Sequence, residues 1–314
     1  MPTLHPQIEK VLEAMARLDL APIEAMTPDE ARRQMEVMAA SRKAEPLPTK
    51  KIENRTIPGP AGDIPVRIYW PNAEGILPAI AYYHGGGHVI GSLDSHDLIA
   101  RNLCGGAAAV VVSVDYRMGP EHRFPAAVED SFAGLEWLRA NAASLGADPE
   151  RLGVHGDSAG ANLAAVVALL ARDKGGPQIR LQSLVYPVAD FRMETASYTT
   201  YATGCGILTA DAMKWFRGHY LRTMADALDW RASPVLAPDL KGVAAAIVIA
   251  AECDVLHDEG LAYAERLKEA GVPVEYRRYA GMIHAFFGMM PAVDDAMNAQ
   301  RAVWAAFKKA FAVD

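Results

Sequence analysis

The sequence predicts an α/β protein whose core is a mixed, mostly parallel sheet of eight strands flanked by helices. From residue 77 onward, apolar segments of four to seven residues alternate with helical segments, which is typical of strand–helix repeats. The apolar segments show no polar alternation, and this indicates strands that are buried on both faces of a parallel sheet. Two earlier segments joined by a turn rich in Gly and Pro predict an antiparallel start.

The first two strands form a predicted hairpin over residues 51–59 and 64–70, with the turn at Pro58–Asp63. The next six strands are predicted at 77–83, 109–114, 151–155, 181–186, 245–251 and 274–279. Helices between them are predicted at 94–104, 125–143, 161–171 and 259–270.

Two regions do not fit the strand–helix alternation. Residues 7–43 have helical spacing, and Thr27 followed by Pro28 predicts a helix start. Residues 188–240 are longer than an ordinary connection between a strand and a helix and are rich in aromatic side chains. We expect both regions to form a helical cap over the carboxyl ends of the strands. The predicted division is cap at 1–45 and 188–240, and core at 46–187 and 241–314.

Composition excludes several classes of protein. The net charge is −7 and no basic stretch is long enough to suggest nucleic-acid binding. No apolar run approaches the length of a membrane span, and the first residues lack the order of a signal peptide, so a cytoplasmic protein is expected. The three cysteines, Cys104, Cys205 and Cys253, are widely spaced, which predicts neither a disulfide framework nor a zinc site.

A candidate nucleophile lies in the segment Gly156-Asp157-Ser158-Ala159-Gly160. The segment stands between a predicted strand and a predicted helix, which is the context that a Gly-x-Ser-x-Gly nucleophile turn requires. A serine hydroxyl is a poor nucleophile at neutral pH, so it needs a neighbouring base, an acid behind that base and donors for the oxyanion.

Candidates for the base and the acid follow the last two predicted strands. His284 comes just after the last strand, and Asp254 comes just after the strand at 245–251. The chain order Ser, Asp, His is that of α/β-hydrolases, and all three residues fall at strand carboxyl ends. In this arrangement Asp254 orients the imidazole and His284 takes the serine proton. Glu252 and Asp258 are the alternatives for the acid.

Consecutive glycines follow the strand at 77–83 in the segment His84-Gly85-Gly86-Gly87. Their backbone N–H groups can approach a ligand closely and predict oxyanion donors, with the Ala159 N–H as another. A phosphate loop is the rival interpretation, but Ile90 stands where a third glycine is needed and no Gly-Lys-Ser/Thr follows. His84 and His88 do not have the spacing of a helical metal pair, so no metal site is predicted.

Together these segments resemble the hormone-sensitive-lipase-like carboxylesterases, the bacterial family IV esterases of the α/β-hydrolase fold. The segments that carry the resemblance are residues 83–91, 115–122, 124–127, 156–160, 254–260 and 284–286. Two departures are Met118-Gly119, where the family usually has Leu-Ala, and Val255, where it usually has Pro.

The resemblance implies a two-part cap, the triad Ser158, Asp254 and His284, and oxyanion donors at Gly86, Gly87 and Ala159, with no cofactor. Relatives commonly form a homodimer through the last strand, so the resemblance also allows a homodimer here. The implied activity is hydrolysis of short- to medium-chain or aryl carboxylic esters through an acyl-enzyme. Candidate substrate-pocket residues are His88, Phe191, Tyr198, Trp215, Ile283 and Phe286.

Alternative functions stay open at this point. An amidase, a lactonase or a deacetylase would use the same triad, because all of these reactions share a tetrahedral intermediate. A ligand-binding protein on a hydrolase scaffold is the alternative outside enzymes, and such proteins tend to lose a triad residue.

Overall fold

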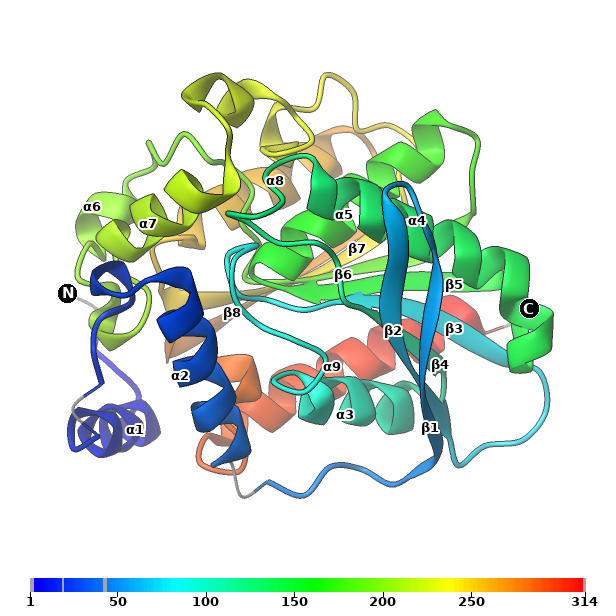
Figure 1. Cartoon of the computed structure of the whole chain (residues 1–314), viewed down its shortest axis with the longest axis horizontal. Coiled ribbons are helices and arrows are strands. Elements are labelled where there is room, and N and C mark those ends of the chain that lie inside the picture. The colour runs from blue at the N-terminus through cyan, green and yellow to red at the C-terminus, as the bar shows by residue number, and fades with distance from the viewer. Residues whose placement is uncertain (1–2, 19, 42–43, 313–314) are drawn as a thin grey trace.

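The computed structural model describes residues 3–18, 20–41 and 44–312. Within these residues, eight strands form one sheet in the order β1-β2-β4-β3-β5-β6-β7-β8 (Figure 1). β1 pairs antiparallel with β2, β2 pairs antiparallel with β4, and the other neighbours are parallel. The strand bounds are β1 Thr49–Gly59, β2 Gly62–Pro71, β3 Leu77–Tyr83, β4 Val110–Val114, β5 Ala147–Asp157, β6 Ile179–Val185, β7 Ala245–Cys253 and β8 Val274–Ile283.

Helices cover both faces of this sheet, so its central strands are buried on both sides. The α-helices are α1 Pro6–Ala16, α2 Pro28–Ala40, α3 Asp97–Ala107, α4 Ala126–Asn141, α5 Ala159–Asp173, α6 Ser197–Thr200, α7 Ala210–Tyr220, α8 His257–Glu269 and α9 Asp294–Phe311. α3 and α9 pack on one face, and α4, α5 and α8 pack on the other (Figure 1). The predicted fold class, a mostly parallel eight-stranded sheet flanked by helices, is therefore confirmed.

The observed elements differ from the predicted ones mainly at their ends. β3 has its predicted bounds, while β5 begins four residues before the predicted strand at 151–155 and ends two residues after it. α5 begins at Ala159, directly after Ser158, rather than at Ala161. No element was predicted after residue 286, although Val303, Phe307 and Phe311 have the spacing of one helix face and are buried along α9.

The N-terminal region contains two helices, and the second begins where Thr27 and Pro28 predict a helix start. α1 ends at Ala16, and α2 begins after Thr27, whose side chain and Glu30 form a reciprocal capping box. Residues 1–2, 19, 42–43 and 313–314 of the predicted divisions lie outside the described residues.

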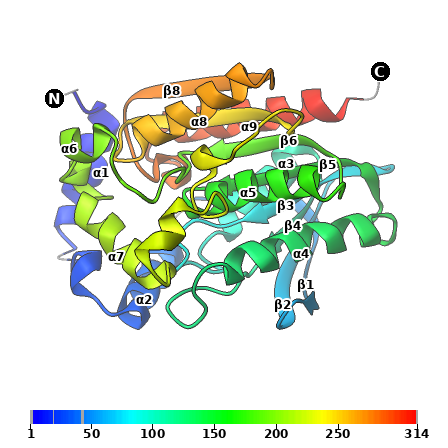
Figure 2. The same cartoon turned by 90° about the horizontal axis from the view of Figure 1, so that it is seen from above.

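The two regions predicted as a cap lie together in the structure. α1, α2, α6 and α7 are grouped at one side of the sheet, seen from above in Figure 2. α7 contacts the 3-10 turn Ile23–Ala25, and the Trp215 indole donates a hydrogen bond to the Met26 carbonyl at 3.1 Å. Segments about 190 residues apart in sequence therefore share one packed unit beside the site described next.

Candidate active site

Ser158 lies in the sharp turn between β5 and α5, residues 156–160, which we call the nucleophile turn. Its φ of 55° and ψ of −118° are a strained combination for a residue with a side chain. The flanking glycines are required by close packing. A Cβ added at Gly156 would lie 2.1 Å from the Gly160 carbonyl oxygen, and one at Gly160 would lie 1.9 Å from the Tyr83 carbonyl oxygen. Only glycine fits at these two positions, and the turn holds Ser158 at the carboxyl end of β5.

The structure brings Ser158, His284 and Asp254 together from three strand ends. His284 Nδ1 lies 2.7 Å from Asp254 Oδ2, and His284 Nε2 lies 3.0 Å from Ser158 Oγ. A carboxylate can only accept, so Nδ1–H donates to Asp254 and Nε2 accepts from the serine hydroxyl. The exposed fractions are 9% for Ser158, 7% for His284 and 1% for Asp254. This arrangement can remove the serine proton and orient the resulting imidazolium in a nearly water-free setting.

The two alternative acids have other partners. Glu252 Oε2 accepts from the Gly281 amide at 2.7 Å, and its Oε1 lies 3.3 Å from an Arg278 nitrogen. Asp258 Oδ2 accepts from the Ser197 amide at 2.8 Å. Of the three candidate carboxylates, Asp254 is therefore the one that contacts His284.

The glycine segment after β3 forms a loop over residues 84–92, which we call the oxyanion loop. Gly86, Gly87 and His88 have φ values of 117°, 62° and 61°, so three consecutive residues have positive φ. The Val89 and Ile90 amides both donate to the Gly86 carbonyl, at 3.0 and 2.9 Å. β3 and β5 are neighbours, so this loop and the nucleophile turn lie at the same edge of the sheet. None of the hydrogen bonds found among the described residues has the Gly86, Gly87 or Ala159 amide as its donor.

An ionised carboxylate, Asp157, lies where the nucleophile turn meets the oxyanion loop. Asp157 accepts from the Tyr82 hydroxyl at 2.9 Å and lies 3.7 Å from His96 Nε2. Burial by itself would raise the pKa of Asp157, but His96 and the Tyr82 hydroxyl outweigh it and lower the pKa to about 2. A Cβ added at Gly85 would lie 2.5 Å from Asp157 Oδ2, so the two loops pack directly on each other.

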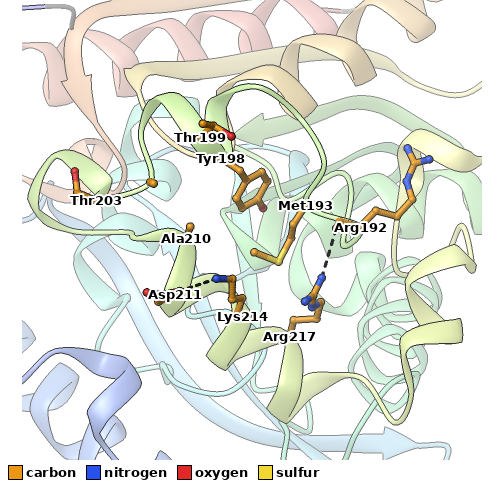
Figure 3. A pocket seen from close by; sticks show the side chains of 10 residues that line it. Arg192, Met193, Tyr198, Thr199, Thr203, Ala210, Asp211, Lys214 and Arg217 are labelled. Atoms are coloured by element: carbon orange, nitrogen blue, oxygen red, sulfur yellow. Dashed lines mark hydrogen bonds and ion pairs between the residues drawn. The ribbon is translucent and has the colours of Figure 1, made fainter.

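The predicted pocket residues are not gathered in one place. Tyr198 lines a cavity of about 520 Å³ formed by residues 192–217. Figure 3 shows the side chains that line it. Ile283 and Phe286 are fully buried in the core that α9 covers. Trp215 is partly buried between α7 and the N-terminal region. The rest of the cavity lining is Arg192, Met193, Thr199, Ala202, Thr203, Ala210, Asp211, Lys214 and Arg217, of which sequence analysis named none.

His88 and Phe191 are buried beside α7. The His88 ring stacks on Tyr220 with centroids 3.9 Å apart, and the Phe191 ring lies 5.9 Å from it. Burial lowers the pKa of His88 to about 3, so its ring is neutral at physiological pH. His88 is thus suited to anchoring the oxyanion loop by packing against Tyr220 and Phe191 rather than to carrying charge.

Several residues in and around the site carry no signal in the sequence. The Tyr186 ring packs against His284 with centroids 4.5 Å apart, and Phe216 packs against Gly87. Arg32 on α2 donates to the Val89 carbonyl of the oxyanion loop. Glu259 accepts from the Ala189 and Asp190 amides, just after β6. No local motif marks these residues, because each acts through a contact between segments distant in sequence.

Two further findings concern metals and membranes. Among the described residues, no group of three or more His, Cys, Asp or Glu side chains is arranged to hold a metal ion. The helices of the described part of the chain include none that is long and apolar enough to cross a membrane.

Comparison with known proteins identifies the family. Residues 80–288 match the family described as having the α/β-hydrolase fold. The chain belongs to this family. It is 45% identical over 244 residues to the carboxylic ester hydrolase LipN of Mycobacterium tuberculosis, covering 76% of this chain and 65% of LipN. It is 38% identical to the ethyl acetate hydrolase of Pseudomonas putida, covering 94% of both chains.

The structural comparison agrees with the sequence comparison. The hyperthermophilic esterase of the archaeon Pyrobaculum calidifontis superposes with a TM-score of 0.91 at 41% identity, covering 98% of this chain and 99% of that one. The expected membership of the hormone-sensitive-lipase-like carboxylesterases within the α/β-hydrolases is therefore confirmed.

Proposed function

We propose that this member of the α/β-hydrolase family is a serine carboxylesterase that hydrolyses short- to medium-chain or aryl carboxylic esters. One observation carries the proposal: His284 bridges Ser158 and Asp254 at 3.0 and 2.7 Å in a nearly buried setting. The esterase names of its relatives support the same reaction class.

The proposed reaction begins with attack of Ser158 Oγ on the ester carbonyl carbon. The serine proton passes to His284 Nε2, while Asp254 accepts from Nδ1–H and stabilises the imidazolium. The carbonyl oxygen becomes an oxyanion, which the Gly86, Gly87 and Ala159 amides would stabilise by donating hydrogen bonds. The alcohol then leaves with the proton from His284. This step leaves an acyl group on Ser158.

Hydrolysis of the acyl-enzyme repeats these steps with water as the nucleophile. His284 accepts a proton from water, the hydroxide adds to the acyl carbon, and the same amides stabilise the second oxyanion. Collapse of this intermediate releases the carboxylic acid and returns the proton to Ser158. The balance requires one water and no cofactor.

The substrate range is proposed from the cap and from the relatives. Residues 1–45 and 188–240 would form a two-part cap, whose aromatic side chains favour apolar acyl or aryl groups. The ethyl acetate hydrolase of Pseudomonas putida supports activity on short acyl chains.

Initial-rate hydrolysis of p-nitrophenyl acetate, butyrate, octanoate and laurate tests the proposal. Ser158→Ala should lose roughly 10³-fold or more in kcat/KM, because removing one triad residue disables the others. Ser144→Ala, a change at an exposed serine, is the matched control and should keep full activity. Wild-type rates on every ester no higher than those of Ser158→Ala would contradict the proposal. Parallel assays with anilides and lactones separate ester preference from amidase or lactonase activity.

We also propose a cytoplasmic homodimer. The composition supports the location, and β8 supports the assembly, because it ends the sheet and leaves one side of a strand available for pairing. Light scattering on the purified protein would contradict the dimer if it gave a mass near 33.8 kDa at micromolar concentration.

A further inference from the structure

The oxyanion loop has few bonds of its own. Its internal hydrogen bonds close a turn at Gly86. Gly86 and Gly87 adopt positive φ without steric cost, but His88 carries a side chain and has a φ of 61°, which such residues rarely adopt. Such backbone persists only where the surrounding structure fixes it. The contacts that fix this loop therefore bear on the position of the oxyanion donors.

Arg32 supplies one set of these contacts from α2. Its Nε donates to the Val89 carbonyl at 2.9 Å, and its Nη2 donates to the Gly119 carbonyl at 2.9 Å. Nη1 and Nη2 also donate to the two carboxylate oxygens of Glu121, at 2.8 and 2.7 Å. One guanidinium thus ties α2, the oxyanion loop and the 119–121 segment together.

The hydrogen bonds of Arg32 belong to a network that also links the oxyanion loop to residues 119–121 directly. The Gly119 amide donates to the His88 carbonyl at 2.8 Å, so the 119–121 segment and the oxyanion loop are also joined directly. Glu36 lies one turn further along α2, where it accepts from the Ser92 hydroxyl at 2.5 Å. α2 therefore contacts this part of the loop at both Val89 and Ser92.

Exposure distinguishes a positioning role from a role in stability alone. The Arg32 side chain is 26% exposed and that of Glu121 is 50% exposed, and ion pairs this open contribute little to the free energy of unfolding. What the pair contributes is geometry, since the planar fork of arginine reaches a carboxylate and two carbonyls at once. A lysine ammonium could not make this set of bonds.

We propose that Arg32 is a positioning residue for the oxyanion hole, because its bonds to Val89, Gly119 and Glu121 fix the loop that carries the Gly86 and Gly87 amides. The inference rests on the proposed esterase function. It assigns the N-terminal helix α2 a part in the chemical step as well as in covering the site.

Steady-state kinetics on p-nitrophenyl acetate, butyrate and octanoate test this inference with Arg32→Lys, Arg32→Ala and the exposed neighbour Arg33→Ala as matched control. Both Arg32 variants should lose about 10- to 100-fold in kcat, the order of loss expected when catalytic groups shift by about 1 Å. KM should change by less than about threefold, because oxyanion contacts act in the transition state. The fold-loss should be the same for all three esters, since they share one oxyanion.

Two further measurements keep the test sharp if Arg32→Ala folds poorly. Added guanidinium chloride at non-denaturing concentration should restore part of kcat in Arg32→Ala and leave Arg33→Ala unchanged. Glu121→Gln keeps the Arg32 bonds to Val89 and Gly119, so its loss in kcat should be smaller than that of Arg32→Lys.

The outcomes separate the two proposals. A wild type inactive on every ester would overturn the esterase function and this inference with it. An active wild type whose Arg32 variants match Arg33→Ala in kcat would overturn the positioning role alone. A loss that falls on KM and varies with acyl length would overturn it too, because it would place Arg32 in substrate binding.

Discussion

The nucleophile turn and the oxyanion loop are neighbouring glycine-rich turns, and they are held in different ways. The nucleophile turn is fixed by backbone packing, since Gly156 and Gly160 leave no room for a Cβ against main-chain atoms. The oxyanion loop is fixed by side chains from elsewhere, with Arg32 on one side and Phe216 on another. One turn therefore depends on the core and the other on contacts from α2 and α7, and changes in each should have different consequences.

Gly160→Ala should have the largest effect on folding. Its Cβ would lie 1.9 Å from the Tyr83 carbonyl oxygen, and neither backbone can move without disturbing the central sheet. We expect a loss of more than about 4 kcal/mol in the free energy of unfolding, a size reserved for severe core disruption. Urea denaturation measures it. Gly218→Ala is the control, because nothing lies within 4 Å of its Cβ and a helical Gly→Ala change stabilises by about 0.5–1 kcal/mol. Equal stability of the two variants would contradict the prediction.

Gly87→Ala should mainly reduce activity. Its Cβ would lie 2.1 Å from the Phe216 ring, so the loop or the ring must move. We expect kcat/KM to fall roughly 100-fold, the order seen when one oxyanion donor is lost. Because one obstacle is a side chain, adding Phe216→Ala to Gly87→Ala should recover about tenfold or more, while the positive φ of residue 87 keeps activity below that of wild type. A double-mutant cycle on p-nitrophenyl butyrate measures this coupling, and purely additive losses would show that α7 does not hold the loop.

Glu259 tests the segment that follows β6 beside the nucleophile turn. Its Oε1 accepts from the Ala189 and Asp190 amides at 2.8 and 3.2 Å, and it is 1% exposed. Glu259→Ala leaves the Ala189 and Asp190 amides without an acceptor and should lower the free energy of unfolding by about 2–3 kcal/mol. Glu259→Gln keeps an acceptor in a group of the same size and should cost less than about 1 kcal/mol.

Glu259 should also make the stability of the protein depend on pH. Burial raises the pKa of Glu259 well above its usual value, so the folded state holds this proton more tightly than the unfolded state. The stability that it contributes is greatest below the unfolded pKa of about 4.3 and declines as pH rises toward the folded pKa. The free energy of unfolding of wild type should therefore fall relative to that of Glu259→Gln as pH rises from 5 to 8, as measured by urea titrations. A constant difference over that range would contradict the shifted pKa.

Asp115, which lies near His84 of the oxyanion loop, gives the smallest expected effect on stability when it is changed to Asn. Burial is the main cause that raises the pKa of Asp115 to about 6, and its Oδ1 lies 3.9 Å from His84 Nε2. A raised carboxyl pKa means that ionisation opposes folding, with the loss developing between about pH 4 and 6. The substitution should raise Tm slightly at pH 8 and leave it unchanged at pH 4. An equal rise in Tm at both values would show that the carboxylate is not responsible.

Much of the fold and the main site residues could be predicted because their signals are local. An apolar strand, a glycine-flanked serine and a helix are adjacent in sequence at 151–171, and that adjacency predicts the turn. Asp254 and His284 could be placed because parallel strands end at one edge of the sheet. The residues that line the pocket were harder to predict from sequence. Ile283 is the last residue of β8 and Phe286 follows it, and both side chains are buried in the core beneath α9.

By itself, the sequence determined the alternation of strands and helices, the serine, histidine and aspartate at the strand ends and the glycines that permit two tight turns. The sequence favoured Asp254 over Glu252 and Asp258 as the partner of His284, and the tertiary structure brings the two side chains into contact. Tertiary structure alone decided which side chains line the cavity, and that Arg32 and Phe216 reach the oxyanion loop. The physical reason is the sequence separation over which each interaction acts. Periodicity and turn chemistry act over a few residues, whereas these contacts join segments from about 30 to more than 120 residues apart, which only the packed fold brings together.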